Sequence, residues 1–384
     1  MTDGDHVPRP RVAVIYHMFP HYRAPVMRAL TRSERYDFSF WGSHDPIDGI
    51  KAFTGDAEVE VHPLGFHRTG EGGIFSGLWT LVFSRRFDAL IVLGNPRFGQ
   101  TWAAAVLARL TGKTVLFWGH GWLRDYSPLK TLMRHTYFGL ANGIMVYSDR
   151  ARALADQTGF PAAKVYPIYN SLDWEAAQGH RATLEIETPA ALRAEVGYPQ
   201  DRPILICTAR LTPLCRFDLL IEAAAIMNRK GHRPLVVLVG DGPMRETLEA
   251  QAKAAGVDAR FTGAVYDEAI LSRLLYAADV TVSPGKVGLT AMHSLSYGTP
   301  VVTHGDLNEQ MPEVEAIVEG RTGAFFQSGD AADLARAIEG VLDWPTDRSA
   351  IRAACMAVME DRYTPGAQVE RIEAALDSIG TRKR

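Results

Sequence analysis

The segment 203–230, PILICTARLTPLCRFDLLIEAAAIMNRK, joins an apolar strand to an amphipathic helix and decides the fold class. From Phe217 onward, apolar residues recur at i, i+3, i+4 and i+7, which is the spacing of a helix that packs one face on a sheet. The same theme opens the chain, where RVAVIYH at 11–17 precedes a helical pattern at 23–31. The sequence therefore contains at least two strand–helix units.

Several further runs are apolar without alternation, and amphipathic patterns and turn residues separate them. They are residues 89–93, 114–118, 144–147, 236–239, 280–282 and 301–303. Continuous apolar strands are typical of sheets that are covered on both faces. We therefore predict α/β architecture with parallel sheets.

At 384 residues the chain is long enough for two domains, each with its own core. The polar stretch 174–201 has no strong hydrophobic periodicity, and Pro199 and Pro203 bracket the point where the next strand pattern begins. We therefore place one domain at 1–180 and another at 190–358. A final amphipathic helix at 367–378 has no partner that the pattern alone can name.

Charge and cysteine content narrow the function classes. The net charge of −3 gives no basic field over the whole molecule, which argues against nucleic acid as the main partner. The three cysteines form no CxxC pair, which favours a reducing cytosol. Asp3 and Asp5 lie in a polar tail and are interpreted as solubilising, and no other carboxylates or histidines have metal-ligand spacing, so no metal is predicted.

The segment 283–302, SPGKVGLTAMHSLSYGTPVV, is the most informative for a binding site. A glycine-containing loop leads into a helix that begins near Leu289, with Thr290 near its first turn. Free amides and the helix dipole at such a start favour a phosphate. Gly285 and Gly288 would let a diphosphate approach the backbone, and Lys286 would add a charge. Taken alone, a glycine before a helix is more often only a tight turn.

Two other loops follow predicted strands. ARLTPLCRFD at 209–218 places Arg210 and Arg216 at the carboxyl end of a strand, where open α/β sheets bind ligands and guanidinium groups suit phosphate. GHGW at 119–122 places His120 between two glycines at another strand end. A catalytic and a structural role for this histidine are equally compatible with its position.

Together these segments resemble the retaining glycosyltransferases of family 4, which have the two-domain GT-B fold with Rossmann-like domains facing across a cleft. The matching stretches occur in that family's order over nearly the whole chain. They are ARLTPLCRFDLLIEA, VGDGPMRETLEAQA, FTGAVYDEAILSRLLYAADVTVSP, GLTAMHSLSYGTPVV and GRTGAFF, with FWGHG and YNSLD in the first half.

The resemblance implies a metal-independent hexosyl transfer from a nucleotide-diphosphate sugar. Arg210, Arg216, Lys286 and His120 would act on the diphosphate and the transferred sugar. The remaining donor-site positions would be Gly285, Val287, Gly288, Leu289, Thr290, His293, Arg23 in PHYR and Asn170 in YNSLD. The resemblance also implies that residues 363–384 return to the first domain.

The sequence departs from the family at three of these places. Cys215 stands where a lysine usually contacts the diphosphate, with Arg216 one residue away. Gly285 and His293 stand where the family has two glutamates separated by seven residues, which hold the sugar and the ribose. Either Lys286 and His293 take over donor recognition in a divergent subgroup, which we favour, or the chain is inactive.

The expected role is extension of a bacterial surface glycan or of a lipid-linked glycan acceptor, with a UDP-sugar ahead of a GDP-sugar as donor and no cofactor. Alternatives are an inactive nucleotide-sugar-binding partner of another transferase and a nucleotide-sugar epimerase. No apolar run is long enough to span a bilayer, so a cytoplasmic protein is expected. Predicted helices at 74–86 and 127–140 combine aromatic or aliphatic residues with arginines. They could rest on the inner face of the membrane, although packing on the first domain's sheet is the simpler interpretation.

Overall fold

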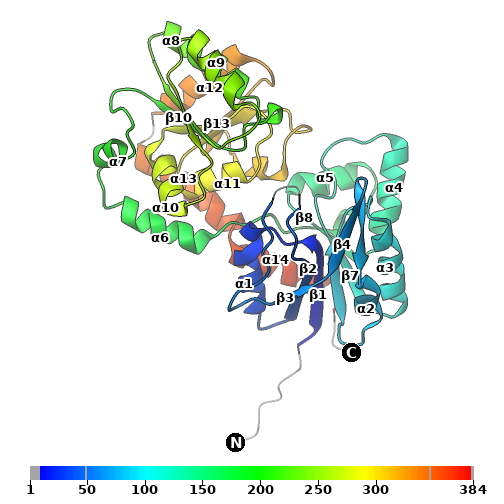
Figure 1. Cartoon of the computed structure of the whole chain (residues 1–384). Coiled ribbons are helices and arrows are strands. Elements are labelled where there is room, and N and C mark those ends of the chain that lie inside the picture. The colour runs from blue at the N-terminus through cyan, green and yellow to red at the C-terminus, as the bar shows by residue number, and fades with distance from the viewer. Residues whose placement is uncertain (1–8, 48–49, 346, 382–384) are drawn as a thin grey trace, which may run out of the picture. The chain divides into compact units, whose positions relative to one another are not determined.

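Two parallel sheets, each flanked by helices, organise the computed structural model, which describes residues 9–47, 50–345 and 347–381 (Figure 1). The chain divides into two units. Unit 1 comprises the residues up to Leu172 together with those from Thr364 onward, and unit 2 comprises Asp173–Tyr363. The predicted α/β class is thus confirmed.

The sheet of unit 1 has the strand order β3-β2-β1-β6-β7-β8-β9, and its described strands pair in parallel. The strands are β1 (Arg11–Met18), β2 (Asp37–Ser43), β3 (Val61–Pro63), β6 (Ala89–Leu93), β7 (Thr114–Trp118), β8 (Gly143–Val146) and β9 (Val165–Pro167). The chain builds outward from β1 in one direction and then restarts at β6 on the other side. Loops that leave β1 and β6 therefore diverge, which opens a crevice at the carboxyl ends of the strands.

The other elements of unit 1 cover this sheet. They are the single turn η1 (His21–Arg23), α1 (Ala24–Thr31), the antiparallel hairpin β4 (Gly65–Thr69) and β5 (Gly72–Ser76), α2 (Leu78–Phe83), α3 (Gly99–Leu110), α4 (Pro128–Gly139), α5 (Asp149–Gln157), η2 (Ala162–Lys164) and α14 (Pro365–Ser378). The helix predicted at 127–140 is confirmed as α4. The helix predicted at 74–86 is wrong in its first part, because residues 72–76 pair with 65–69 as a hairpin and only Leu78–Phe83 is helical.

The sheet of unit 2 has the order β12-β11-β10-β13-β14-β15. Its strands are β10 (Ile204–Thr208), β11 (Leu235–Val239), β12 (Ala259–Gly263), β13 (Val280–Ser283), β14 (Val301–His304) and β15 (Gly323–Phe326). The helical elements are α6 (Trp174–Leu184), α7 (Pro189–Glu195), η3 (Pro213–Cys215), α8 (Phe217–Arg229), α9 (Arg245–Ala254), α10 (Glu268–Ala277), α11 (Leu289–Ser296), η4 (Pro312–Ala316), α12 (Ala331–Leu342) and α13 (Arg348–Arg362). The order reverses between β10 and β13, the switch point of this sheet.

The continuous apolar runs form the inner strands, as predicted. Every residue of β6, β11, β13 and β14 is buried, which is the pattern of a sheet covered on both faces. The switch-point strand β10 is buried except at its last residue, Thr208, where the chain turns into a loop.

The stretch 174–201, predicted to be a break between domains, is instead mostly helical. Asp173 caps α6 by accepting a hydrogen bond from the Ala176 amide at 3.0 Å, and Thr188 caps α7. Both helices contact α10 of unit 2. The boundary therefore lies at Leu172, and residues 173–180 belong to unit 2 rather than to the first domain.

The last helix, α14, packs in unit 1 against α1, β8 and β9, although it follows unit 2 in the chain (Figure 1). Ile372, Ala375 and Leu376 are buried in the core of unit 1. The Gln368 side chain donates to the Tyr169 carbonyl and accepts from the Ser171 hydroxyl, each at 2.7 Å. Gln368 thus fixes the segment that leads from unit 1 into unit 2.

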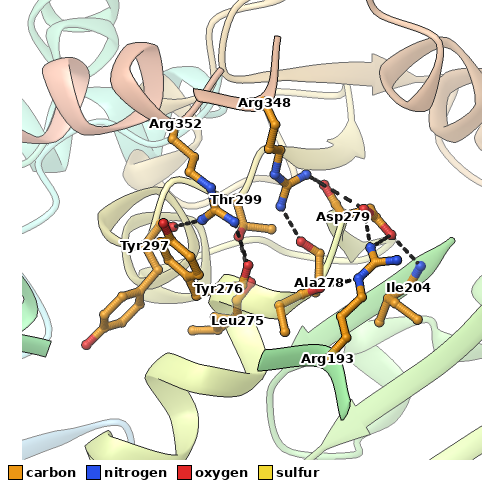
Figure 2. Close-up of polar contacts among 11 residues, drawn as sticks. Arg193, Ile204, Leu275, Tyr276, Ala278, Asp279, Tyr297, Thr299, Arg348 and Arg352 are labelled. Atoms are coloured by element: carbon orange, nitrogen blue, oxygen red, sulfur yellow. Dashed lines mark hydrogen bonds and ion pairs between the residues drawn. The ribbon is translucent and has the colours of Figure 1, made fainter. Parts of the chain in front are cut away.

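An arginine-rich network joins the last helix of unit 2 to the start of β13 (Figure 2). Asp279 accepts two hydrogen bonds from Arg193 at 2.6 and 2.7 Å and one from the Ile204 amide at 2.8 Å. Arg348 donates to the Asp279 carbonyl at 2.7 Å, and Arg352 donates to the Tyr276 carbonyl at 2.7 Å. This network lies at the opposite end of the strands from the switch-point loops, so its role is structural.

Candidate functional site

A cavity of about 1170 Å³ lies at the carboxyl ends of β1, β6, β7 and β8 in unit 1. Its lining comes from the loops that leave these strands, from the β4–β5 hairpin and from α4. Because parallel strands present all their carboxyl ends at one edge of the sheet, segments far apart in the sequence meet here. The cavity is therefore built by the topology described above.

Arg23 lies on one side of this cavity, against an aromatic cluster of Tyr16, Trp118 and Tyr147. Its guanidinium carbon is 4.5, 4.7 and 5.7 Å from the three ring centres, respectively. The Nη2 atom donates to the Tyr147 hydroxyl and, at 3.4 Å, to the Tyr16 hydroxyl. The negative faces of the rings stabilise the cation. Arg23 is thus held firmly by groups that carry no charge.

The buried guanidinium of Arg23 is only partly hydrogen-bonded. The residue is 8% exposed, and its Nε and Nη1 atoms are buried without a hydrogen-bond partner. No carboxylate in the described part of the chain pairs with it. Burying a charge without a counter-charge is costly, so this arrangement favours an anionic ligand at Arg23.

His120 follows β7 and faces the same cavity. The next residue, Gly121, has φ +60°, and a Cβ there would meet the Val146 side chain at 2.5 Å, so glycine is required for the turn that presents His120. The imidazole lies edge-on to the Tyr147 ring, with centroids 5.1 Å apart. His120 is exposed at the cavity. Desolvation by the cavity walls, together with the charges of Arg23 and Arg134, lowers the pKa of His120 to about 4.

The charge balance of the cavity lining is strongly basic. Among its described residues, six arginine or lysine side chains face two carboxylates. Arg97 pairs with Glu71 at 3.2 Å, whereas Lys130 and Arg134 on α4 form no ion pair within the described ranges. Arg134 packs on Tyr126, 4.3 Å from the ring centre, and its Nε is buried without a partner. Burial lowers the pKa of Arg134, a sign that its charge is poorly solvated.

In unit 2 the predicted loops meet at the switch point between β10 and β13. The Gly285 amide donates to the Cys215 carbonyl at 3.1 Å, and a Cβ on Gly285 would lie 2.0 Å from the Leu214 carbonyl oxygen. Gly285 is therefore required for close packing of the two loops. Its predicted role, close approach of a diphosphate, stays a prediction, and its amide is already bonded to Cys215.

About one helical turn after Gly285, the start of α11 retains free backbone amides. Gly288 is the N-cap, and no side chain caps the amides of Gly288, Leu289 and Thr290. The Thr290 hydroxyl donates to the Thr208 carbonyl at 2.9 Å, which fixes this helix start beside the end of β10. Uncapped first-turn amides next to a strand end are suited to binding phosphate oxygens.

Val287 does not offer a free amide, in contrast to its predicted donor-binding role. Its N–H donates to Oε1 of Gln310 at 2.8 Å, and its side chain is fully buried. Gln310 is itself buried and also donates to the Thr303 hydroxyl at 2.9 Å and the His304 carbonyl at 3.0 Å. Gln310 is thus a positioning residue for the loop, and no sequence pattern distinguishes it from the surrounding polar segment.

The predicted basic residues of unit 2 differ in how far they are neutralised. Arg210 is exposed directly after β10, and its side chain forms no ion pair with any described residue. Arg216 adopts a left-handed conformation with φ +52° and pairs with Asp218 at 2.9 Å. Lys286 lies 3.8 Å from a carboxylate oxygen of Glu309. Arg210 is therefore the most available cation of the three.

His293 is also engaged. Its Nε2 atom lies 2.7 Å from Glu268 on α10, and the same carboxylate accepts a hydrogen bond from Tyr297. The predicted ribose contact of His293 stays a prediction, and with Nε2 paired with Glu268 it would use the other ring nitrogen. Burial, the largest single influence, raises the pKa of Glu268, but the hydrogen bonds from His293 and Tyr297 together with nearby positive charge lower the pKa overall. Glu268 was not predicted, since an acidic residue in a first helical turn is common.

Asn170 lies in the junction segment between Tyr169 and Ser171, both of which are bound by Gln368 of α14. Its own Oδ1 accepts from the Ser171 amide at 3.2 Å. This places Asn170 at the point where the chain enters unit 2.

Among the described residues, no three histidine, cysteine, aspartate or glutamate side chains converge as a metal site would require. No described helix combines the length and apolar character needed to cross a bilayer. Asp3 and Asp5 lie outside the described residues.

Sequence comparison identifies relatives for most of the chain. Residues 190–355 match the family Glycosyl transferases group 1. The chain is 26% identical over 253 residues to alpha-D-kanosaminyltransferase of Streptomyces kanamyceticus, covering 62% of this chain and 61% of that protein. It is 37% identical over 219 residues to a GDP-mannose-dependent alpha-(1-6)-phosphatidylinositol dimannoside mannosyltransferase of Mycobacterium tuberculosis, covering 52% and 56%. The matches thus span about half to two thirds of these relatives.

Structural comparison covers nearly the whole chain. HepE of Anabaena, in complex with UDP, aligns with a TM-score of 0.70 at 16% identity, covering 97% of this chain and 100% of the other. The apo form of the lipopolysaccharide outer core galactosyltransferase WaaB aligns with a TM-score of 0.69 at 14% identity, covering 96% and 99%. The chain therefore has the two-domain GT-B fold of glycosyltransferases, and its residues 190–355 match the glycosyl transferases group 1 family.

Proposed function

We propose that this protein is a glycosyltransferase that takes a sugar from a nucleotide-diphosphate donor and retains the anomeric configuration. The observation that carries the proposal is the uncapped start of α11 beside the end of β10. There the free amides of Gly288, Leu289 and Thr290 lie near the loop that carries the unpaired Arg210. The match of residues 190–355 to a glycosyltransferase family supports the same proposal.

The chemistry follows from the charge that develops in the reaction. When the bond between the sugar and the diphosphate breaks, negative charge grows on the departing phosphate oxygens. Fixed amides and an arginine that face those oxygens stabilise the transition state more than the ground state. In this proposal Arg210 and the α11 amides supply that stabilisation, and Gln310 keeps the loop in place.

The acceptor is assigned to the cavity of unit 1, where His120 is open to a ligand. With its pKa lowered to about 4, His120 is neutral at physiological pH and can hydrogen-bond a sugar hydroxyl without adding charge. We propose a glycan or lipid-linked glycan as acceptor and a role in bacterial surface glycan synthesis, with a UDP-sugar ahead of a GDP-sugar as donor. Leu129 and Leu132 on α4 are largely exposed, which fits peripheral contact with the inner face of the membrane.

The test combines binding with turnover. Thermal denaturation of the whole chain with UDP, GDP and their common sugars should show one nucleotide family that raises the melting temperature, because a ligand that binds only the folded state stabilises it. Chromatography of the stabilising donor should then show slow release of free nucleotide diphosphate. If none of the donors shifts the melting temperature at millimolar concentration, the proposal is wrong.

A second candidate is an inactive nucleotide-sugar-binding partner of another transferase. The pairing of Lys286 with Glu309 and of His293 with Glu268 favours it, because these side chains are already engaged. Donor binding without any donor consumption would select this candidate. Conversion of the donor to a different nucleotide sugar, without acceptor, would instead reveal an epimerase.

A further inference from the structure

Arg23 is an unusual residue because it is a buried cation with no acidic partner. Its guanidinium is held by three aromatic rings and two tyrosine hydroxyls, which orient it but leave its charge uncompensated. Two of its nitrogen atoms, Nε and Nη1, have no hydrogen-bond partner. Each of these N–H groups lacks an acceptor, so an anion bound at Arg23 would supply hydrogen bonds that the protein itself leaves unmade.

The surroundings of Arg23 strengthen this charge rather than neutralise it. Arg134 and Lys130 line the same cavity from α4, and neither forms an ion pair with a described residue. The charges of Arg23 and Arg134 both act on His120, so the two cations lie within electrostatic range of the same imidazole. Neighbouring cations within low-dielectric walls attract an anion but give a neutral competitor no such advantage, so the cavity selects for negative charge.

We propose that the acceptor bound in the unit 1 cavity carries a phosphate or diphosphate group, whose oxygens pair with Arg23 and face Arg134 and Lys130. This inference rests on the proposed function only in calling the ligand the acceptor. The evidence for the anion site comes from unit 1 alone. Three cations without a carboxylate partner call for more than one negative charge, which a phosphate supplies and a single carboxylate does not. A neutral hydroxyl of the same ligand would then lie near His120.

The first experiment measures anion binding by calorimetry, with the whole chain and inorganic pyrophosphate at low salt. An Arg210→Gln background removes the main cation of the unit 2 site, so that the remaining heat reports on unit 1. In this background we expect Arg23→Gln to weaken pyrophosphate binding at least tenfold. Arg23→Lys, which keeps the charge but loses the guanidinium N–H groups, should weaken it less. The exposed Arg152 on α5 lies outside the cavity, and Arg152→Gln is the matched control that should change nothing.

Because Arg23 is buried, its substitution could affect folding, so Lys130→Gln provides an independent measure on an exposed side chain. We expect Lys130→Gln to lower pyrophosphate affinity about threefold, because it removes one charge that solvent and salt partly screen. The melting temperature should not change. The proposal is overturned if the parent chain binds no pyrophosphate at millimolar concentration. Equal binding by Arg23→Gln, Lys130→Gln and Arg152→Gln would overturn it as well.

Two further arms identify the source of the phosphate. Co-sedimentation with phosphatidylcholine vesicles that contain phosphatidic acid, lost in Arg23→Gln and absent with phosphatidylcholine alone, would assign a lipid-borne phosphate. Binding of glucose 1-phosphate without vesicle binding would assign a soluble phosphate ester. Either result supports the anion site.

Measuring nucleotide-sugar binding in the same variants distinguishes failure of this inference from failure of the proposed function. If a nucleotide sugar binds and Arg23→Gln weakens that binding as much as it weakens pyrophosphate, Arg23 serves the donor and the inference is wrong. If pyrophosphate binding depends on Arg23 but no nucleotide sugar binds, the proposed function is wrong and the anion site remains.

Discussion

The two candidate sites of this protein lie in similar places of similar sheets, yet they present charge in opposite ways. The unit 1 cavity contains cations without acidic partners, among them the buried Arg23. In unit 2, Arg216 pairs with Asp218, and Lys286 and His293 each face a glutamate. Among the described residues of the unit 2 site, the groups left free are the backbone amides at the start of α11 and the exposed Arg210.

This contrast shows that the same topological position can bind anions by two physical routes. In unit 1 net charge provides the attraction, which is sensitive to salt and tolerant of ligand shape. In unit 2 the direction of fixed dipoles provides it, which demands that a phosphate lie at one place against the helix start. The sites should therefore respond differently to the same kinds of substitution.

The largest effect is expected for Arg210, which forms no ion pair with a described residue. Arg210→Gln should lower kcat/KM for transfer about 100-fold, or about 2.7 kcal/mol, as for loss of one donor to a transition-state anion. Arg216→Gln should cost much less, because Asp218 already occupies that guanidinium. Steady-state kinetics of both variants with the donor found by thermal denaturation provide the measurement. Equal losses in the two variants would contradict the distinction between free and paired cations.

A smaller effect should isolate the backbone amides. Leu289 is the first residue of α11, a position where proline fits a helix but removes the N–H. We expect Leu289→Pro to weaken donor binding about tenfold, equivalent to one charge-assisted hydrogen bond of about 1.4 kcal/mol. Leu289→Ala, which shortens the side chain and retains the amide, is the control. If the two substitutions weaken donor binding alike, the amide is not a ligand.

The smallest expected effect concerns protonation in the unit 1 cavity. Because the pKa of His120 is lowered to about 4, below the usual value near 6.5, the unfolded chain binds a proton in the pH interval between these values while the folded chain does not. Folding stability from this residue is therefore complete above that interval and is lost progressively as the pH falls from about 6.5 to about 4. His120→Gln should flatten part of this decline in pH-dependent denaturation curves. An imidazole titration midpoint near 6.5 in an NMR experiment would show that neither desolvation nor the charges of Arg23 and Arg134 act on the ring.

Much of the fold could be predicted from the sequence because inner strands of parallel sheets are continuously apolar. Strands β6 and β7 coincide with their predicted ranges, and β10 differs by one residue. The edge strands escaped prediction, since β3 and β9 are three residues long and β12 is only half-buried. The helices of 174–195 were missed because one face packs on unit 2 through few apolar residues, and their caps, Asp173 and Thr188, resemble ordinary loop residues.

The candidate site was harder to predict because its decisive features are pairings. The sequence places Gly285 and Val287 in the correct loop, but only the structure shows that their amides are already bonded to Cys215 and Gln310. Conversely, nothing in the pattern PHYR indicates that Arg23 lacks an acidic partner, since that depends on strands and loops 100 residues away. Residue type can be read from a motif, whereas hydrogen-bond satisfaction requires the surrounding fold.

The return of α14 to unit 1 has a consequence for how the protein is made. Ile372, Ala375 and Leu376 complete a core whose other members are all synthesised in the first 168 residues. During translation, the face of the N-terminal sheet that α14 covers stays uncovered until the whole of unit 2 has left the ribosome. Unit 2, which is contiguous in the chain, can finish folding first. A premature stop after Tyr363 would therefore spare the later-made unit and damage the earlier one.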